Sequence, residues 1–155
     1  MKKFDFRRHG PLALFGVLTA GMVVFIWLNS CLSGEVSGAQ SGRVTAWLLS
    51  ILDPQGKMDV DAFHYFVRKS AHFLGFAVLG VLVGGLFGRM EALTQRRFRS
   101  LPVLMVLLVA VLDEYIQFFS GRGSMVTDVV LDFSGGLTGF AAVEIFVFLR
   151  RKIKK

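Results

Sequence analysis

Four long runs of apolar residues divide the sequence, and polar or charged segments separate them. The runs cover residues 12–32, 70–88, 101–119 and 129–149. A membrane-spanning helix needs roughly 20 mostly apolar residues to cross about 30 Å of hydrocarbon. The pattern therefore predicts four spans. Pro102 fits the first turn of the third span, because that position needs no backbone N–H donor.

Basic residues flank these runs in three blocks. They are Lys2, Lys3, Arg7 and Arg8 before the first run, Arg89, Arg96, Arg97 and Arg99 between the second and third, and Arg150, Arg151, Lys152, Lys154 and Lys155 after the fourth. Cytoplasmic loops of membrane proteins carry an excess of lysine and arginine. With four spans all three blocks fall on one side, so we expect both termini in the cytoplasm and segments 33–67 and 120–127 outside.

A different interpretation treats the first 31 residues as a signal peptide. The basic start and the apolar run lead to Leu28-Asn29-Ser30-Cys31, which approaches a lipoprotein cleavage site. Cleavage would leave three spans and an acylated Cys31. We favour a retained anchor, because the run is long enough to span and Asn29 fits poorly beside the small residues of such a site.

The first outer segment contains an amphipathic pattern. Its apolar residues recur at helical spacing, at Val44, Trp47, Leu48, Ile51 and Leu52, before Asp53 and Pro54. A short interfacial helix with Trp47 in the headgroup layer fits this stripe. Packing of the stripe against the spans fits equally well. A second helix is expected to start with Asp59 or Asp61 as N-cap and to continue into the second span.

Composition favours a membrane protein over a soluble one. Of 155 residues, 54% are hydrophobic, and the mean hydropathy of +0.59 exceeds what a soluble surface permits. A net charge of +7 in a soluble protein would suggest a nucleic-acid partner, but here the basic residues flank apolar runs. We therefore expect one all-α integral membrane domain, a four-transmembrane-helix bundle that contacts membrane lipids and no nucleic acid.

Polar and ionisable side chains lie near the outer ends of three predicted spans. Such residues are costly within a membrane and are default hypotheses for a functional site. The second span carries His64, Arg68, Lys69 and His72, the third ends with Asp113, Glu114 and Gln117, the loop supplies Arg122, and the fourth opens with Asp128 and Asp132. Spacings of four residues place His64, Arg68 and His72 on one helical face. The predicted topology brings the whole group to one depth.

Two roles fit this group. It could be an ion-pair network that locks three helices together, or it could form a pocket open to the outer leaflet. We favour the pocket, because the polar groups outnumber what locking requires. Glycines repeat every four residues in the second span, at Gly80, Gly84 and Gly88, and in the fourth, at Gly135 and Gly139. This spacing predicts that the two spans pack closely.

The polar residues also form ordered motifs: Arg68-Lys69-x-x-His72-Phe73, Asp113-Glu114-x-x-Gln117-Phe118, Gly121-Arg122, Asp128, Asp132 and Gly135-Gly136. In order, spacing and placement on the spans they resemble the VanZ-like membrane protein family, over nearly the whole chain. The resemblance implies a multi-pass plasma-membrane protein of a Gram-positive bacterium, associated with resistance to the glycopeptide teicoplanin. It implies no catalytic residue. It identifies Arg68, Lys69, His72, Asp113, Glu114, Gln117, Arg122, Asp128 and Asp132 as the family's characteristic polar residues.

We favour a non-enzymatic protein whose outer pocket recognises an anionic lipid or a lipid-linked cell-wall precursor. Arg68, Lys69 and Arg122 would hold phosphate, since guanidinium groups can do so with paired hydrogen bonds. The four carboxylates of the group would orient these cations or accept hydrogen bonds from sugar hydroxyls.

The alternative is a membrane-embedded hydrolase or transferase acting on a lipid-linked phosphate. His72 would be its general acid or base, with Asp113, Glu114 or Asp128 as the further catalytic candidates. We expect no cofactor and no bound metal, because lysine and arginine among the possible ligands would repel a cation. Proton-coupled transport is disfavoured, because four spans show no inverted repeat.

Overall fold

The computed structural model describes residues 6–153, which form five helices and no strand. The helices are α1 (Phe6–Ser30), α2 (Gly34–Leu52), α3 (Val60–Thr94), α4 (Leu101–Phe119) and α5 (Val126–Ile153). Within the described range, α1 from His9 onward, α3, α4 and α5 are long and apolar enough to cross a membrane. The predicted all-helical fold is confirmed, and so is the presence of four helices able to span a membrane. Lys2, Lys3, Lys154 and Lys155, which belong to the basic blocks, lie outside the described residues.

The helices differ from the predicted runs at their ends. α3 has 35 residues and extends beyond 70–88 on both sides. Its N-cap is Asp59, whose carboxylate accepts hydrogen bonds from the backbone N–H groups of Asp61 and Ala62. A helix that continues into the second span is therefore confirmed, with Asp59 as the cap. α1 ends at Ser30 instead of residue 32, because the chain turns there into α2.

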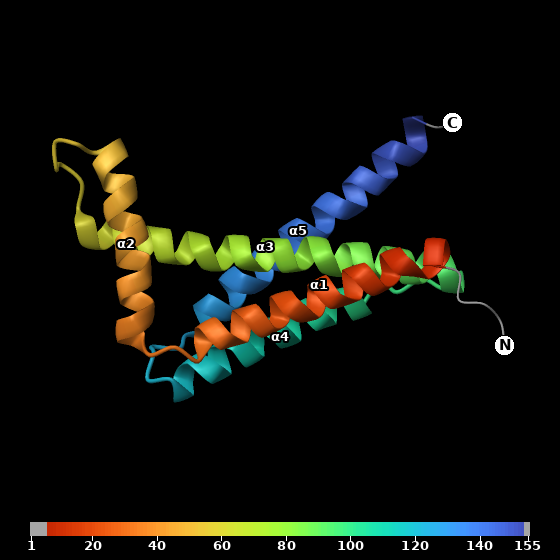
Figure 1. Cartoon of the computed structure of the whole chain (residues 1–155), viewed down its shortest axis with the longest axis horizontal. Helices are drawn as coiled ribbons and strands as arrows, with labels where there is room; N and C mark the ends of the chain where they lie inside the picture. The colour runs from red at the N-terminus through yellow and green to blue at the C-terminus, as the bar shows by residue number, and fades with distance from the viewer. Residues whose placement is uncertain (1–5, 154–155) are drawn as a thin grey trace.

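Three of the helices share one long axis. α1, α3 and α4 contact one another along it, α5 crosses them obliquely, and α2 stands across the axis at one end (Figure 1). The α4–α5 turn lies at the same end as α2, whereas the start of α1, the end of α5 and the α3–α4 connection lie at the opposite end (Figure 1). The predicted outer and inner segments are thus separated along the bundle.

Glycines bring α3 and α5 into backbone contact, and these two helices make the most extensive contact of any pair. A Cβ atom at Gly80 would overlap the carbonyl oxygen of Gly136, and one at Gly139 would overlap the carbonyl oxygen of Ala77. Small residues at a helix crossing allow this approach. The predicted packing of the second span on the fourth is confirmed, but Gly88 lies outside it, with no neighbour within 4 Å of an added Cβ.

A small core holds the bundle together, and a broad apolar surface surrounds it. The core consists of Ile26, Phe76, Leu79, Val83, Val106, Val109 and Ala110. Large apolar side chains such as Leu14, Val17, Leu108 and Phe146 are exposed. Apolar area left in water costs about 25 cal/mol per Å², whereas lipid tails remove that cost. This surface fits a multi-pass membrane protein.

The apolar stripe of α2 is mostly exposed. Trp47, Ile51 and Leu52 have exposed fractions of 63%, 57% and 62%, while Thr45 on the same helix is buried. Most of the stripe therefore does not pack against the spans. The helix also begins at Gly34, well before the stripe, because Ser33 caps it by accepting a hydrogen bond from the backbone N–H of Val36.

Candidate functional site

The polar residues singled out by sequence gather at the α2 end of the bundle, on α3, α4, α5 and the turn between α4 and α5. Six of them are buried: Asp113, Glu114, Gln117, Arg122, Asp128 and Asp132. The other three, Arg68, Lys69 and His72, are half-buried on α3. So dense a group of buried polar side chains needs partners, because an unpaired buried charge is strongly destabilising.

Asp113 lies in the centre of the group and is completely buried. Its Oδ1 accepts a hydrogen bond of 2.5 Å from the Ser30 hydroxyl on α1, and its Oδ2 accepts one of 2.7 Å from Nε2 of Gln117. The Ser120 hydroxyl in turn donates to the backbone carbonyl of Ser30 at 2.7 Å. These bonds join the end of α1 to the end of α4 and fix the orientation of the Asp113 carboxylate.

Charged pairs link α3 to α5. Lys69 forms an ion pair with Asp128, and both side chains are largely buried. One turn further along both helices, Nδ1 of His72 lies 3.5 Å from Oδ1 of Asp132. The two pairs share a register because residues 69 and 72 on α3 face residues 128 and 132 on α5. Close glycine packing of the same two helices holds this register.

The turn after α4 carries Arg122 back over the bundle. Gly121 has a φ of 69°, in the left-handed region that favours glycine. The backbone N–H of Arg122 donates to the carbonyl of Gln117 at 3.1 Å, and that of Gly121 donates to the carbonyl of Phe118 at 3.3 Å. This pair of bonds is a Schellman motif, which ends a helix and reverses the chain. The sequence Gly121-Arg122 therefore positions the guanidinium.

Arg122 is buried and incompletely paired. Its Nη1 donates to the backbone carbonyl of Asn29 at 3.4 Å, and its Nε has no hydrogen-bond partner among the described residues. Burial lowers the pKa of Arg122 from its usual value, and the positive charge of Arg68 lowers it further, against the opposing effect of nearby carboxylates. The guanidinium groups of Arg68 and Arg122 are therefore close enough to interact electrostatically.

A cavity of about 280 Å³ opens between α1, α2, α3 and α4. Arg68, His72, Asp113 and Arg122 line its polar part, together with Asn29 and hydroxyl groups of α1 and α2. Its apolar lining comes from Met22, Phe25, Ile26, Val44, Ala71, Gly75 and Phe76. Neither Arg68 nor Arg122 forms an ion pair within residues 6–153. The cavity thus joins two arginines that form no ion pair with the described residues to an apolar wall.

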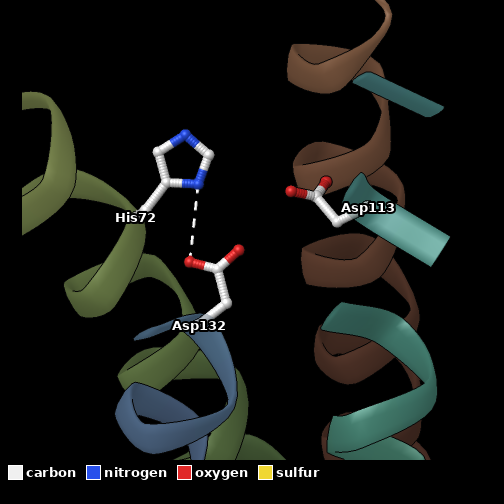
Figure 2. A group of neighbouring side chains, drawn as sticks. All are labelled: His72, Asp113 and Asp132. Atoms are coloured by element: carbon white, nitrogen blue, oxygen red, sulfur yellow. Dashed lines mark ion pairs between the residues drawn. The ribbon is translucent and has the colours of Figure 1, made fainter. Parts of the chain in front are cut away.

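Three possible metal ligands also converge at this site. His72, Asp113 and Asp132 each offer one ligand atom, and these atoms all lie within 4.8 Å of one another. Figure 2 shows the three side chains on three different helices, with the carboxylate of Asp132 directed toward the space between the other two. This set of one imidazole and two carboxylates could hold a cation.

A model of the VanZ/LLP1 family matches residues 15–147. The chain belongs to the VanZ family. The match includes all nine polar residues from Arg68 to Asp132 and most of the four spanning helices. No curated protein and no solved structure matches the chain.

The structure of this VanZ-family protein divides the predicted polar group into subsets. Arg68, His72, Asp113 and Arg122 line the cavity, whereas Lys69, Glu114, Gln117, Asp128 and Asp132 stand behind it. Oε2 of Glu114 accepts a hydrogen bond from the backbone N–H of Met125 at 3.2 Å, while its Oε1 has no partner among residues 6–153. His64 shares the face of Arg68, but its Nε2 is bonded to the Ser41 hydroxyl at 2.6 Å and it does not line the cavity.

Sequence reasoning on this VanZ-family protein missed α1 as a contributor to the site. Ser30 donates to Asp113, and the carbonyl of Asn29 accepts from Arg122. A signal was present: two polar residues, Asn29 and Ser30, close an otherwise apolar run at the end of α1 that lies beside α2. Polar residues at such a position can turn inward as readily as they can face a loop.

Proposed function

We propose that this protein recognises the phosphate of an anionic lipid, or of a lipid-linked cell-wall precursor, in the cavity lined by Arg68 and Arg122. The observation that carries the proposal is the pairing pattern. Lys69 is neutralised by Asp128, whereas neither arginine of the cavity has an ion-pair partner within residues 6–153. A phosphate group would supply the missing negative charge.

The chemistry of the arginines suits a phosphate group. A guanidinium group presents a planar fork of N–H donors that binds phosphate oxygens with two parallel hydrogen bonds. Asp113 is the carboxylate in the cavity lining that could neutralise the arginines. Both of its oxygens, however, already accept hydrogen bonds, from Ser30 and Gln117. We therefore assign phosphate binding to Arg68 and Arg122, and a positioning role to Lys69, Glu114, Gln117, Asp128 and Asp132.

The apolar wall of the cavity supports a lipid over a soluble phosphate. Met22, Phe25 and Ile26 on α1, with Gly75 and Phe76 on α3, continue the cavity along the bundle axis away from the arginines. A ligand with a charged head and a hydrocarbon chain would place its head near Arg68 and its chain against these residues. Burial of the chain would contribute about 0.8 kcal/mol per CH₂ group.

We propose that the cavity opens to the outer leaflet of the plasma membrane of a Gram-positive bacterium. The basic blocks favour an arrangement with both termini in the cytoplasm, which puts the α2 end of the bundle outside. The exposed Trp47, Ile51 and Leu52 would rest in the headgroup layer, so α2 would lie at the membrane surface beside the cavity. All five helices would form a single domain, because α2 also contacts α3.

A binding experiment with matched ligands and matched variants tests the proposal. Purified protein in detergent is titrated with geranylgeranyl phosphate, and with geranylgeraniol as the same chain without the charge. Hydrogen bonds to charged groups contribute about 1.5–3 kcal/mol each, so Arg68→Ala and Arg122→Ala should weaken phosphate-dependent binding roughly 10- to 100-fold. Arg43→Ala removes an exposed arginine on α2 that does not line the cavity and should leave binding unchanged.

The proposal fails if geranylgeraniol binds as tightly as the phosphate, or if well-folded Arg68→Ala binds like wild type. The proposed link to glycopeptide resistance is tested separately. Expression in a susceptible Gram-positive host should raise the inhibitory concentration of teicoplanin, and Arg68→Ala expressed at the same level should abolish the increase.

A further inference from the structure

The side chains of His72, Asp113 and Asp132 come from three helices, yet their ligand atoms converge within 4.8 Å. His72 is on α3, Asp113 on α4 and Asp132 on α5. Figure 2 shows their polar ends turned toward one another across the space between the helices. A cation held there would connect these three helices at one point, in addition to their apolar core and the ion pair between Lys69 and Asp128.

The state of Asp132 points to a ligand. Its side chain is completely buried, and neither carboxylate oxygen has a hydrogen-bond partner in the described part of the chain. The nearest group that could carry a positive charge is the imidazole of His72, whose Nδ1 lies 3.5 Å from Oδ1 of Asp132. A buried carboxylate without hydrogen bonds is rare, because its desolvation is not compensated. A metal ion between Asp132, Asp113 and His72 would compensate it.

The local charge balance also permits a cation. Asp113 and Asp132 would bring two negative charges and a neutral His72 none, which together match a divalent ion. We expected no metal from the sequence because basic residues are interleaved with the acids. The ion pair with Asp128 neutralises Lys69. Arg68 and Arg122 remain as the opposing positive charges, and they line the cavity side of the site.

The donor atoms define the class of metal. One imidazole nitrogen and two carboxylate oxygens suit Zn²⁺ or Mn²⁺. Three protein ligands leave a coordination position open for water or for a phosphate oxygen. The hydrogen bonds from Ser30 and Gln117 to Asp113 would act as supporting contacts that orient a ligand carboxylate.

We propose that His72, Asp113 and Asp132 bind one divalent transition-metal ion at the base of the cavity. This inference goes beyond the proposed recognition of a lipid phosphate and does not depend on it. It predicts a stoichiometric, saturable site that exists in the protein without any lipid.

The test uses the full chain, purified in detergent and stripped of metal with a chelator. The protein is dialysed against Zn²⁺ and, in parallel, against Mn²⁺, and the bound metal is counted by inductively coupled plasma mass spectrometry. Wild type should bind one ion per chain. Asp132→Asn and His72→Ala should each lose at least nine-tenths of the occupancy that wild type shows at the same free metal concentration.

Glu144→Gln is the matched control, because it removes an exposed carboxylate from the same helix, outside the group of three ligands. It should retain stoichiometric metal. Circular dichroism and size-exclusion chromatography identify variants that have not folded, and His72→Gln replaces His72→Ala if the latter fails. Substoichiometric binding by folded wild type, or equal binding by wild type and Asp132→Asn, overturns the proposal. Geranylgeranyl phosphate binding by the metal-stripped protein is measured in the same preparation, so failure of the metal site is distinguished from failure of lipid recognition.

Discussion

Replacement of Gly80 by alanine should separate α3 from α5 and destabilise the protein. The added Cβ would overlap the carbonyl oxygen of Gly136 and would lie 2.9 Å from the backbone nitrogen of Phe140. Both neighbours are backbone atoms of a helix, so neither can rotate away as a flexible side chain could. The two helices would have to move apart along a contact that also sets the register of His72 opposite Asp132.

The expected cost follows from two opposing effects. Overpacking a close contact costs about 1–3 kcal/mol, whereas alanine is up to about 1 kcal/mol more favourable than glycine within a helix. Gly88→Ala is the matched control, since it lies on the same helix in the same four-residue repeat but has open space at its Cβ. Gly88→Ala should be neutral or slightly stabilising, and the two variants should differ by about 2 kcal/mol, or roughly 30-fold in the unfolding equilibrium constant.

Reversible unfolding in sodium dodecyl sulfate, followed by circular dichroism, measures this difference. Gly84→Ala should fall between the other two, because its added Cβ would lie 3.1 Å from the Cβ of Val143, a much milder overlap than the 1.9 Å between a Cβ at Gly80 and the carbonyl oxygen of Gly136. Equal stability of Gly80→Ala and Gly88→Ala would refute the reasoning, because it would mean that α3 and α5 do not rely on backbone contact at residue 80.

Three further predictions concern charge pairing, topology and the membrane surface. Lys69→Met and Asp128→Asn should each destabilise the protein, and the double variant should be destabilised by less than the sum of the two. The difference is the coupling energy, expected at about 0.5–3 kcal/mol in unfolding; a coupling of zero contradicts the ion pair. Cys31, which is exposed, should react with a membrane-impermeant maleimide added to intact cells; labelling only after lysis contradicts an outer α2. In a Trp27→Phe background, the remaining Trp47 should be quenched most strongly by lipids brominated near the headgroup; quenching only by soluble acrylamide contradicts an interfacial α2.

The spans were predictable because one physical requirement, a run of apolar residues long enough to cross the hydrocarbon, outweighs local detail. Their ends were less predictable because hydrogen bonds decide them. The start of α3 is the exception, because Asp59 was a candidate N-cap by residue type and it does cap the first turn. Ser33 starts α2 ten residues before Val44, the first residue of the apolar stripe, and the hydropathy pattern contains no information on that cap.

The members of the site were predictable, but their pairing was not. Adjacent residues on a helix point about 100° apart, so the rotation of α3 decides whether Arg68 or Lys69 meets α5. The structure turns Lys69 toward Asp128 and Arg68 toward the cavity. The contribution of Ser30 was missed for a related reason, since it depends on which side of α1 faces α4.

The most direct test of the central claim is native mass spectrometry of the protein purified with its own membrane lipids. We predict that wild type and the control Arg43→Ala retain a co-purifying phosphate-containing lipid, and that Arg68→Ala and Arg122→Ala lose it while remaining folded. A wild-type protein that carries no specific lipid, or an Arg68→Ala variant that carries the same lipid at the same occupancy, would contradict phosphate recognition in this cavity.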